Sequence, residues 1–322
     1  MMDNSWERSI PFYHLDLVTA SLLFRQFDPK TKLEGIQQLN EGKRNTNYRI
    51  HTSSGDYVLR IYPLGDESWR KESKIRSVWQ DEIPLQRLCY LDQQEAIGNR
   101  TFAIYEFVQG QTLLEALLSG YIPNEEVMHQ LGAMLAAIHK FRYPQVGFLN
   151  ERLEVVEELT PLETWYAYFL NSTVCRRLDK GTIDRIGRLV TRNKDRLRDM
   201  DQQVSLVHGD FRPTNLLILE GKITCILDWE FAMAGHSIAD IGQLFRYEGQ
   251  FQANQKQAFV QAYNERSVWE LPADWERLGK MRDLVNLLQM LGTEEELPVK
   301  FMDLSQLIEG TLQKLEAGPL LR

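Results

Sequence analysis

The stretch LVHGDFRPTNLLI, residues 206–218, constrains this chain more than any other because it places charged and amide side chains between two apolar runs. The apolar runs are typical of short buried strands, so the polar residues lie on a tight loop held by core structure. A plain turn between strands needs only a glycine and a proline. The additional Asp210, Arg212 and Asn215 therefore indicate a loop that carries chemistry.

A second acidic motif follows this loop. Asn215 comes after Asp210 with the spacing D-x-x-x-x-N, and Asp228 ends the next apolar run, TCILDW. Two carboxylates and an amide at neighbouring strand ends offer the hard oxygen ligands that suit Mg²⁺, which also takes substrate phosphates. The same spacing occurs in the catalytic loop of kinases, where a later Asp also holds metal. The three residues therefore predict a metal-assisted phosphoryl-transfer site.

The composition limits the class of protein. The chain has 322 residues, of which 43% are hydrophobic and 25% charged, and no apolar run approaches the ~20 residues of a membrane span. The N-terminal MMDNSWERSI lacks the apolar core of a signal peptide. The net charge is −8 without a Lys/Arg block, which disfavours nucleic acid and membrane partners and favours cationic small molecules. Three scattered cysteines without CxxC spacing are typical of a reducing cytoplasm, where we place the protein.

The first third of the chain is predicted to be rich in strands, with one helix. Residues 47–63 alternate around a Ser-Ser-Gly-Asp turn and predict a hairpin. Residues 68–83 predict a polar helix, and residues 102–110 a strand that stops at a glycine. The pattern then changes to helices, with Asn124 as the N-cap of the first. The predicted helices span residues 124–141, 161–171, 182–197, 255–265, 275–291 and 300–315.

Together these motifs resemble the aminoglycoside phosphotransferase and choline kinase-like superfamily of small-molecule kinases. The resemblance depends on HGDFRPTN, ILDWEFAMAGHSIADIG, LGAMLAAIHKF, NYRI…YVLRIY and YEFVQGQTL, and covers about residues 39–244. It implies an α+β, two-lobed, protein-kinase-like fold. Residues 1–108 would form a small, nucleotide-binding lobe with an antiparallel sheet. Residues 109–322 would form a larger, mainly helical lobe that carries the catalytic loop and the acceptor site.

The resemblance also implies a role for each motif residue. Asp210 would be the catalytic base for transfer of the γ-phosphate of ATP to a hydroxyl group, while Asn215 and Asp228 would hold Mg²⁺. Arg212 would neutralise the transferring phosphoryl group or be a solvated side chain. Glu230 would assist the metal through water or have no such role. These last two alternatives stay open from the sequence.

The nucleotide would be bound mainly by the small lobe. Arg60, in YVLRIY, stands where kinases have a Lys that reaches the α- and β-phosphates, and an arginine keeps the charge but changes the shape. Its ion-pair partner would be Glu72, with Glu67 as the alternative. The loop NEGKRNTNY, residues 40–48, has one glycine in place of G-x-G-x-x-G, so the phosphates would contact backbone amides. The remaining nucleotide contacts would come from two segments, the phosphate loop at Asn45 and Thr46 and the adenine connector at Glu106, Phe107 and Val108.

Several neighbouring residues are expected to be structural. His208 would orient the loop, and Asp240 would hydrogen-bond its backbone. The acidic stretches at residues 151–163 and 292–298 are typical of solvated surface, but a stretch that lines the cleft would favour a cationic acceptor. Two other functions stay open: a nucleotide-binding pseudokinase or scaffold, and a metal-dependent hydrolase that uses His208 and Asp210. The intact Asp210, Asn215 and Asp228 set favours the kinase.

Overall fold

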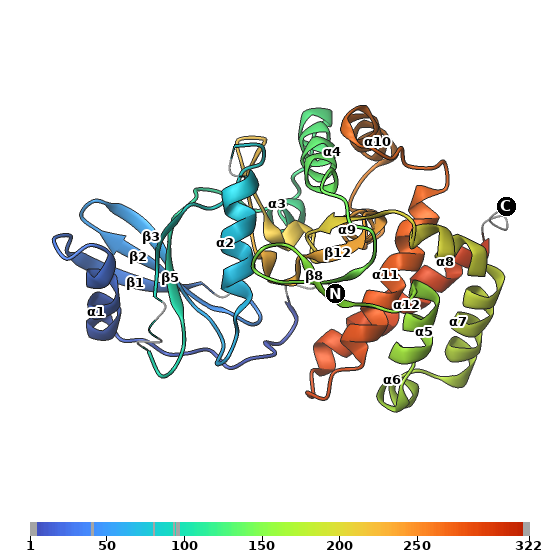
Figure 1. Cartoon of the computed structure of the whole chain (residues 1–322), viewed down its shortest axis with the longest axis horizontal. Helices are drawn as coiled ribbons and strands as arrows, with labels where there is room; N and C mark the ends of the chain where they lie inside the picture. The colour runs from blue at the N-terminus through green and yellow to red at the C-terminus, as the bar shows by residue number, and fades with distance from the viewer. Residues whose placement is uncertain (1–4, 40–41, 80, 93, 95–96, 318–322) are drawn as a thin grey trace.

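The computed structural model describes residues 5–39, 42–79, 81–92, 94 and 97–317. The protein has two lobes, a small one built on an antiparallel sheet and a larger, mainly helical one (Figure 1). This is the expected α+β, two-lobed architecture. Among the helices within these described residues, none has a stretch long and apolar enough to cross a bilayer.

The small lobe contains a five-stranded sheet with a helix on each face. Its strand order is β1-β2-β3-β5-β4, and all neighbouring strands are antiparallel. The β2–β3 pair confirms the predicted hairpin, with Gly55 at φ 131° in the turn. The elements of this lobe are α1 (Leu17–Phe27), β1 (Leu33–Leu39), β2 (Thr46–Thr52), β3 (Gly55–Ile61), α2 (Ser68–Trp79), β4 (Leu88–Leu91) and β5 (Phe102–Glu106).

The expectation of a single helix in the first third is wrong, because α1 precedes the sheet. The side chain of Asp16 accepts a hydrogen bond from the Thr19 amide at 2.7 Å and caps this helix. Ala20, Leu23 and Phe24 lie on its buried face and pack against β2, β3 and β5. Trp69 of α2 packs on the opposite face of the sheet. The sheet core is therefore closed on both sides.

The large lobe contains helices around two small sheets. Its helices are α3 (Leu113–Leu118), α4 (Glu125–His139), α5 (Leu162–Phe169), α6 (Ser172–Arg177), α7 (Lys180–Arg192), α8 (Lys194–Met200), α9 (Ile238–Leu244), α10 (Ala253–Arg266), α11 (Trp275–Leu291) and α12 (Pro298–Ala317). Its strands are β6 (Gln111–Thr112), β7 (Gly147–Leu149), β8 (Val155–Glu158), β9 (Val204–Val207), β10 (Leu216–Leu219), β11 (Lys222–Ile226) and β12 (Met233–His236). The sheet orders are β11-β10-β6 and β8-β7-β12-β9.

The predicted helices are present, but one of them is divided, and the short helices α3, α6 and α9 were not predicted. Asn124 caps α4 by accepting from the Val127 amide, as expected. The helix predicted over 182–197 is in fact two helices, because the chain leaves helical geometry at Asn193 (φ −117°, ψ 23°). The Asn193 side chain donates to the Leu189 carbonyl at 2.8 Å and ends α7 there. The division of the chain between residues 108 and 109 stays a prediction.

Candidate active site

Helix α9 fixes the loop between β9 and β10. Asp240 accepts hydrogen bonds from the amides of His208 at 2.7 Å and Gly209 at 2.9 Å, which confirms its expected role. Gln243, one helical turn further, accepts from the Phe211 amide at 2.9 Å and donates to the Gly209 carbonyl at 2.8 Å. The sequence analysis missed Gln243, although its i+3 spacing from Asp240 places both on one helix face.

His208 is a structural residue of this loop. Its side chain is fully buried, and Nε2 lies 2.7 Å from the Leu227 carbonyl, so Nε2 carries the proton and donates. Nδ1 accepts from the amide of Asp210 at 3.2 Å. Both ring nitrogens are therefore occupied, which confirms the expected orienting role. It also disfavours a hydrolase in which His208 binds a metal or abstracts a proton.

The carboxylate of Asp210 is held by two side chains of its own loop. Arg212 donates from Nε at 2.5 Å to one oxygen and from Nη2 at 2.7 Å to the other, and Asn215 donates from Nδ2 at 2.8 Å. Burial alone would raise the pKa of Asp210, but the charge and hydrogen bonds of Arg212 outweigh it and lower that pKa. Arg212 is thus fixed against the carboxylate, and its side chain is only 15% exposed.

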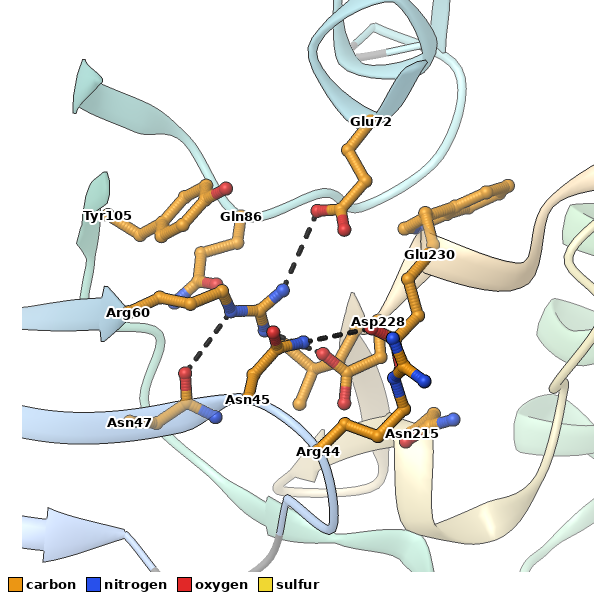
Figure 2. Close-up of polar contacts among 12 residues, drawn as sticks. Arg44, Asn45, Asn47, Arg60, Glu72, Gln86, Tyr105, Asn215, Asp228 and Glu230 are labelled. Carbon is orange, nitrogen blue, oxygen red and sulfur yellow. Dashed lines mark hydrogen bonds and ion pairs between the residues drawn. The ribbon is translucent and has the colours of Figure 1, made fainter. Parts of the chain in front are cut away.

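Arg60 lies at the centre of a buried network between the lobes (Figure 2). Its Nη2 is 2.6 Å from Oδ1 of Asp228, its Nη1 is 3.5 Å from Oε2 of Glu72, and its Nε donates to Asn47 at 3.2 Å. Burial alone would lower the pKa of Arg60, but the charges of Asp228 and Glu72 outweigh it and raise that pKa. The network therefore joins Arg60 of β3 and Glu72 of α2 to Asp228, which lies two residues after the end of β11.

The structure places Glu72, not Glu67, against Arg60. Glu72 is completely buried on α2 and also accepts from Arg76 at 3.3 Å. The Glu67 side chain is 70% exposed and pairs with Arg70 instead. The sequence left open which of the two acids pairs with Arg60. The structure answers this because the Glu72 side chain points into the protein toward Arg60, whereas that of Glu67 points into solvent.

Comparisons with known proteins agree with this geometry. The model of the phosphotransferase enzyme family matches residues 35–279, which is more than half of the chain. The chain belongs to that family. Acyl-CoA dehydrogenase family member 11 of Rattus norvegicus is 26% identical over 65% of this chain but only 27% of its own length. Hygromycin-B 4-O-kinase of Escherichia coli is 24% identical over 69% of this chain and 64% of its own length.

A solved structure shows the same fold. A thermostable form of aminoglycoside phosphotransferase APH(4)-Ia, in a ternary complex with ADP and hygromycin B, superposes with a TM-score of 0.64 at 17% identity. The superposition covers 94% of this chain and all of that one. The solved structure confirms the predicted protein-kinase-like fold, and the family match over residues 35–279 confirms the predicted superfamily. The chain spans about a quarter of the length of the first curated relatives it matches.

The phosphate-loop region of this family member contacts the large lobe. Asn40 and Glu41 of the predicted loop lie outside the described residues. Asn45 donates from Nδ2 to Oε2 of Glu230 at 3.1 Å, as Figure 2 shows, and Arg44 lies 3.5 Å from the other Glu230 oxygen. Burial raises the pKa of Glu230 to about 8, and the charge of Asp228 adds to the effect. Glu230 therefore anchors the loop.

Three of the predicted nucleotide residues line a cavity of about 130 Å³ between the lobes, whereas Asn45, Thr46, Glu72 and Glu106 are not part of its lining. Its lining includes Arg60, Phe107, Val108, Asn215 and Asp228. The side chains of Asn45 and Thr46 are nearly buried, and the Thr46 hydroxyl accepts from the Tyr13 amide at 3.0 Å. The main-chain groups of Glu106 already pair with Arg87 and with Gln86, at 3.0 Å and 2.9 Å. Phe107 and Val108 line the cavity, although the Phe107 amide also donates to the Asp56 carbonyl at 3.3 Å.

The same cavity fits a divalent cation on the chemistry of its donors. The hydrogen bonds of Asn215 use its amide nitrogen, and Arg60 contacts a single oxygen of Asp228. One amide oxygen and one carboxylate oxygen are thus open to the cavity, the few hard ligands that Mg²⁺ combines with phosphate oxygens. Among the described residues, no group of three or more His, Cys, Asp and Glu side chains could hold a metal. The site would therefore be completed by substrate oxygens.

A second cavity, of about 640 Å³, begins at the catalytic loop and extends into the large lobe. Gly209, Glu230 and Gln243 line its catalytic end. Glu157 and Glu158, from the acidic stretch 151–163, also line it, whereas no residue of the stretch 292–298 does. The first acidic stretch therefore borders the cleft, as a cationic acceptor would require.

An N-terminal segment that the sequence analysis missed ties the phosphate loop to α12. Glu7 accepts from the amides of Val299 and Lys300 at 2.8 Å and 3.0 Å, at the start of that helix. Arg8 donates to the carbonyls of Arg44 and Asn45 at 3.1 Å and 3.0 Å. The Glu7 contacts join residues 292 and 293 positions apart and the Arg8 contacts residues 36 and 37 positions apart, so no local pattern could have indicated them.

Proposed function

We propose that this protein is an ATP- and Mg²⁺-dependent phosphotransferase that transfers the γ-phosphate to a hydroxyl group of a small molecule. The observation that carries the proposal is that Asn215 donates to the Asp210 carboxylate at 2.8 Å and lines, together with Asp228, the cavity between the lobes, while Gly209, next to Asp210, lines the larger cavity. A cavity with a cation on one side and an acceptor cavity on the other is the arrangement that in-line phosphoryl transfer needs.

Asp210 receives and orients the acceptor hydroxyl. Because Arg212 lowers the pKa of this carboxylate, Asp210 is ionised at neutral pH and is a weak base. A weak base suits a loose transition state, in which the hydroxyl proton leaves late and positioning matters most. Arg212, fixed beside the carboxylate, adds positive charge where phosphoryl oxygens pass.

Asn215 and Asp228 would hold the magnesium ion, which supplies charge neutralisation to the phosphates when bound. Arg60 carries the charge that faces the α- and β-phosphates, and Glu72 holds its guanidinium in place. Backbone groups of the loop at Asn45 and Thr46 face the remaining phosphate oxygens. Glu106, Phe107 and Val108 form the connector beside the adenine.

The acceptor lies in the larger cavity. Glu157 and Glu158 on β8 line this cavity, and their charge is the feature that would favour the cationic acceptor expected from the sequence, such as an amino sugar or amino alcohol. A solved relative binds ADP and hygromycin B together, which supports a nucleotide and a small-molecule acceptor as the two ligands. An ADP-release assay across amino sugars, amino alcohols and amino acids identifies the acceptor class.

The function is tested with Asp210→Asn, which removes the charge and keeps the shape. We expect the variant to bind ATP and to unfold at the wild-type temperature, while phosphate transfer to the best acceptor falls below detection. Full turnover by the variant would overturn the role of Asp210. ATP binding by the wild type without transfer to any hydroxyl compound of the panel would support the pseudokinase alternative.

A further inference from the structure

A buried arginine lines the acceptor cavity and has no anionic partner there. Arg282 of α11 is 4% exposed, and its Nε and Nη1 donate to Nδ1 of His236 at 3.1 Å and Oδ1 of Asn286 at 2.9 Å. Its guanidinium also lies over the Trp165 ring, 4.9 Å from the centroid. The described residues give Arg282 neutral partners and no ion pair, and these contacts leave Nη2 free to bind a ligand.

The charge of Arg282 is therefore poorly compensated in the folded protein. Burial lowers its pKa to about 10, and the charges of Tyr166, Asp283, Asp240 and Asp201 offset only part of that effect, so the charged form is disfavoured although it persists at neutral pH. The neighbouring Asp283 is occupied by Arg246, which contacts both of its oxygens at 2.7 Å and 2.8 Å. A buried charge without a counter-ion is unfavourable unless a ligand completes it. An anionic group in the cavity would do so.

A second cation lines the same cavity. Lys71 of α2 is partly buried, and its Nζ donates to the carbonyl of Ala232 at 2.6 Å. It reaches the cavity from the small lobe, while Arg282 reaches it from α11 of the large lobe. Three acids also line the cavity: Glu157, Glu158 and Glu230. Burial raises the pKa of Glu230 to about 8, so this acid is mostly neutral at pH 7 and the two cations face mainly the exposed Glu157 and Glu158.

The rest of the lining is largely aromatic. Phe148, Tyr168 and Phe231 expose 48%, 75% and 47% of their surface, although all three are large apolar residues. Trp165 and Phe169 complete the group. Exposed aromatic side chains gathered in one concave site are typical of a surface that an apolar ligand body covers.

The acids on β8 do not outweigh Arg282. Glu157 and Glu158 are exposed, so water and salt screen them. Arg282 is buried, where the effective dielectric constant is about 20 instead of about 80 and the same charge interacts roughly four times more strongly. Arg282 therefore favours a negative charge on the part of the ligand that lies next to it.

We propose that the acceptor is a hydroxylated carboxylic acid with an apolar body, whose carboxylate pairs with Arg282 and whose body lies on the aromatic residues of the cavity. The proposal rests on the proposed phosphotransferase function and replaces the cationic acceptor expected from the sequence with an anionic one. Arg282 is then a specificity residue, because a planar guanidinium fork matches a carboxylate. The hydroxyl group would point to Asp210 at the catalytic end of the cavity.

The test compares three compounds of one shape that differ in charge: phenyllactate, its neutral amide phenyllactamide, and the cationic phenylalaninol. Calorimetry on the wild-type protein should show phenyllactate binding about tenfold or more tightly than the amide, the ratio expected for one charge-assisted contact. Tighter binding of phenylalaninol, or equal binding of all three, would overturn the carboxylate assignment. No phosphate transfer is needed for this measurement.

Variants locate the effect. Arg282→Met should reduce the preference for phenyllactate over phenyllactamide to near one, and Arg282→Lys should leave part of it. Arg188→Met, an exposed arginine on α7 outside the cavity, is the matched control and should keep the full preference. A full preference in Arg282→Met would also overturn the assignment. ADP release measured with the same three compounds tests the proposed phosphotransferase function separately. If phenyllactate binds with the predicted preference but no phosphate is transferred, only the phosphotransferase function is contradicted.

Discussion

Nε of Arg282 donates to Nδ1 of His236 across 3.1 Å, and this contact fixes the tautomer of a buried imidazole. A guanidinium is only a donor, so Nδ1 of His236 carries no proton. Nε2 carries it and donates to Oδ1 of Asp201 at 2.8 Å. Burial lowers the pKa of His236, and the charge of Arg282 lowers it further against the opposing effect of Asp201. The folded protein therefore holds this histidine neutral.

The neutral state of His236 predicts acid-sensitive stability. The unfolded chain protonates this histidine near pH 6.5 while the folded protein does not, so the unfolded state binds more protons below that pH. The free energy of unfolding should fall as the pH falls from 6.5 through the lowered pKa of the folded state. Urea unfolding at about pH 8 and about pH 5 measures this dependence. His236→Gln should lose less stability than the wild type over that interval, and an identical loss would show that His236 is not responsible.

Glu72 should matter for nucleotide use, and Glu67 should not. Glu72→Gln weakens the buried pair with Arg60, so we expect the KM for ATP to rise about tenfold. Glu67→Gln alters an exposed acid that pairs with Arg70 and should leave that KM within about twofold. Steady-state kinetics at saturating acceptor compare the two, with the folded fraction of each variant taken from its unfolding curve. Equal effects would mean that the buried pair does not act on the nucleotide.

Arg212 should contribute to turnover because its guanidinium donates two hydrogen bonds to the Asp210 carboxylate. Arg212→Ala should lower kcat by about tenfold to a hundredfold, because positive charge and orientation are lost together at the reacting group. Arg212→Lys keeps the charge without the two-pronged contact and should recover part of the loss. The exposed Arg25 of α1, changed to Ala, is the control. A wild-type kcat in Arg212→Ala would leave the arginine with a structural role.

Much of the candidate site was predictable because its residues are close in sequence. Asp210, Asn215 and Asp228 follow or precede the short strands β9, β10 and β11, which are consecutive in the chain although β9 belongs to a different sheet. The structural roles of His208 and Asp240 were expected from the two motifs in which these residues lie, HGDFRPTN and ILDWEFAMAGHSIADIG. Arg60 was found because its strand alternates clearly, as the paired β2 and β3 confirm.

Local patterns were weaker where helices begin and end. Helix α1 was missed although Asp16 caps it and its apolar residues recur at helical spacing, because short amphipathic stretches compete with strand patterns. The break at Asn193 depends on a side chain that bonds to its own helix, and helical periodicity continues across it. The position of the loop at residues 40–48 relative to Arg8 and Glu7 depends on contacts between residues far apart in the sequence.

The sequence by itself determined the family, the two-lobed fold and the three-residue candidate motif, because these depend on residue types at fixed short spacings. Only the tertiary structure decided that Glu72 faces Arg60, that Glu230 anchors Asn45, and that the larger cavity is lined by a buried arginine. The physical reason is that burial and charge pairing are properties of neighbours in space. In the sequence Arg282 looks like any other arginine, and only its burial beside the neutral His236 and Asn286 indicates that it could bind an anion.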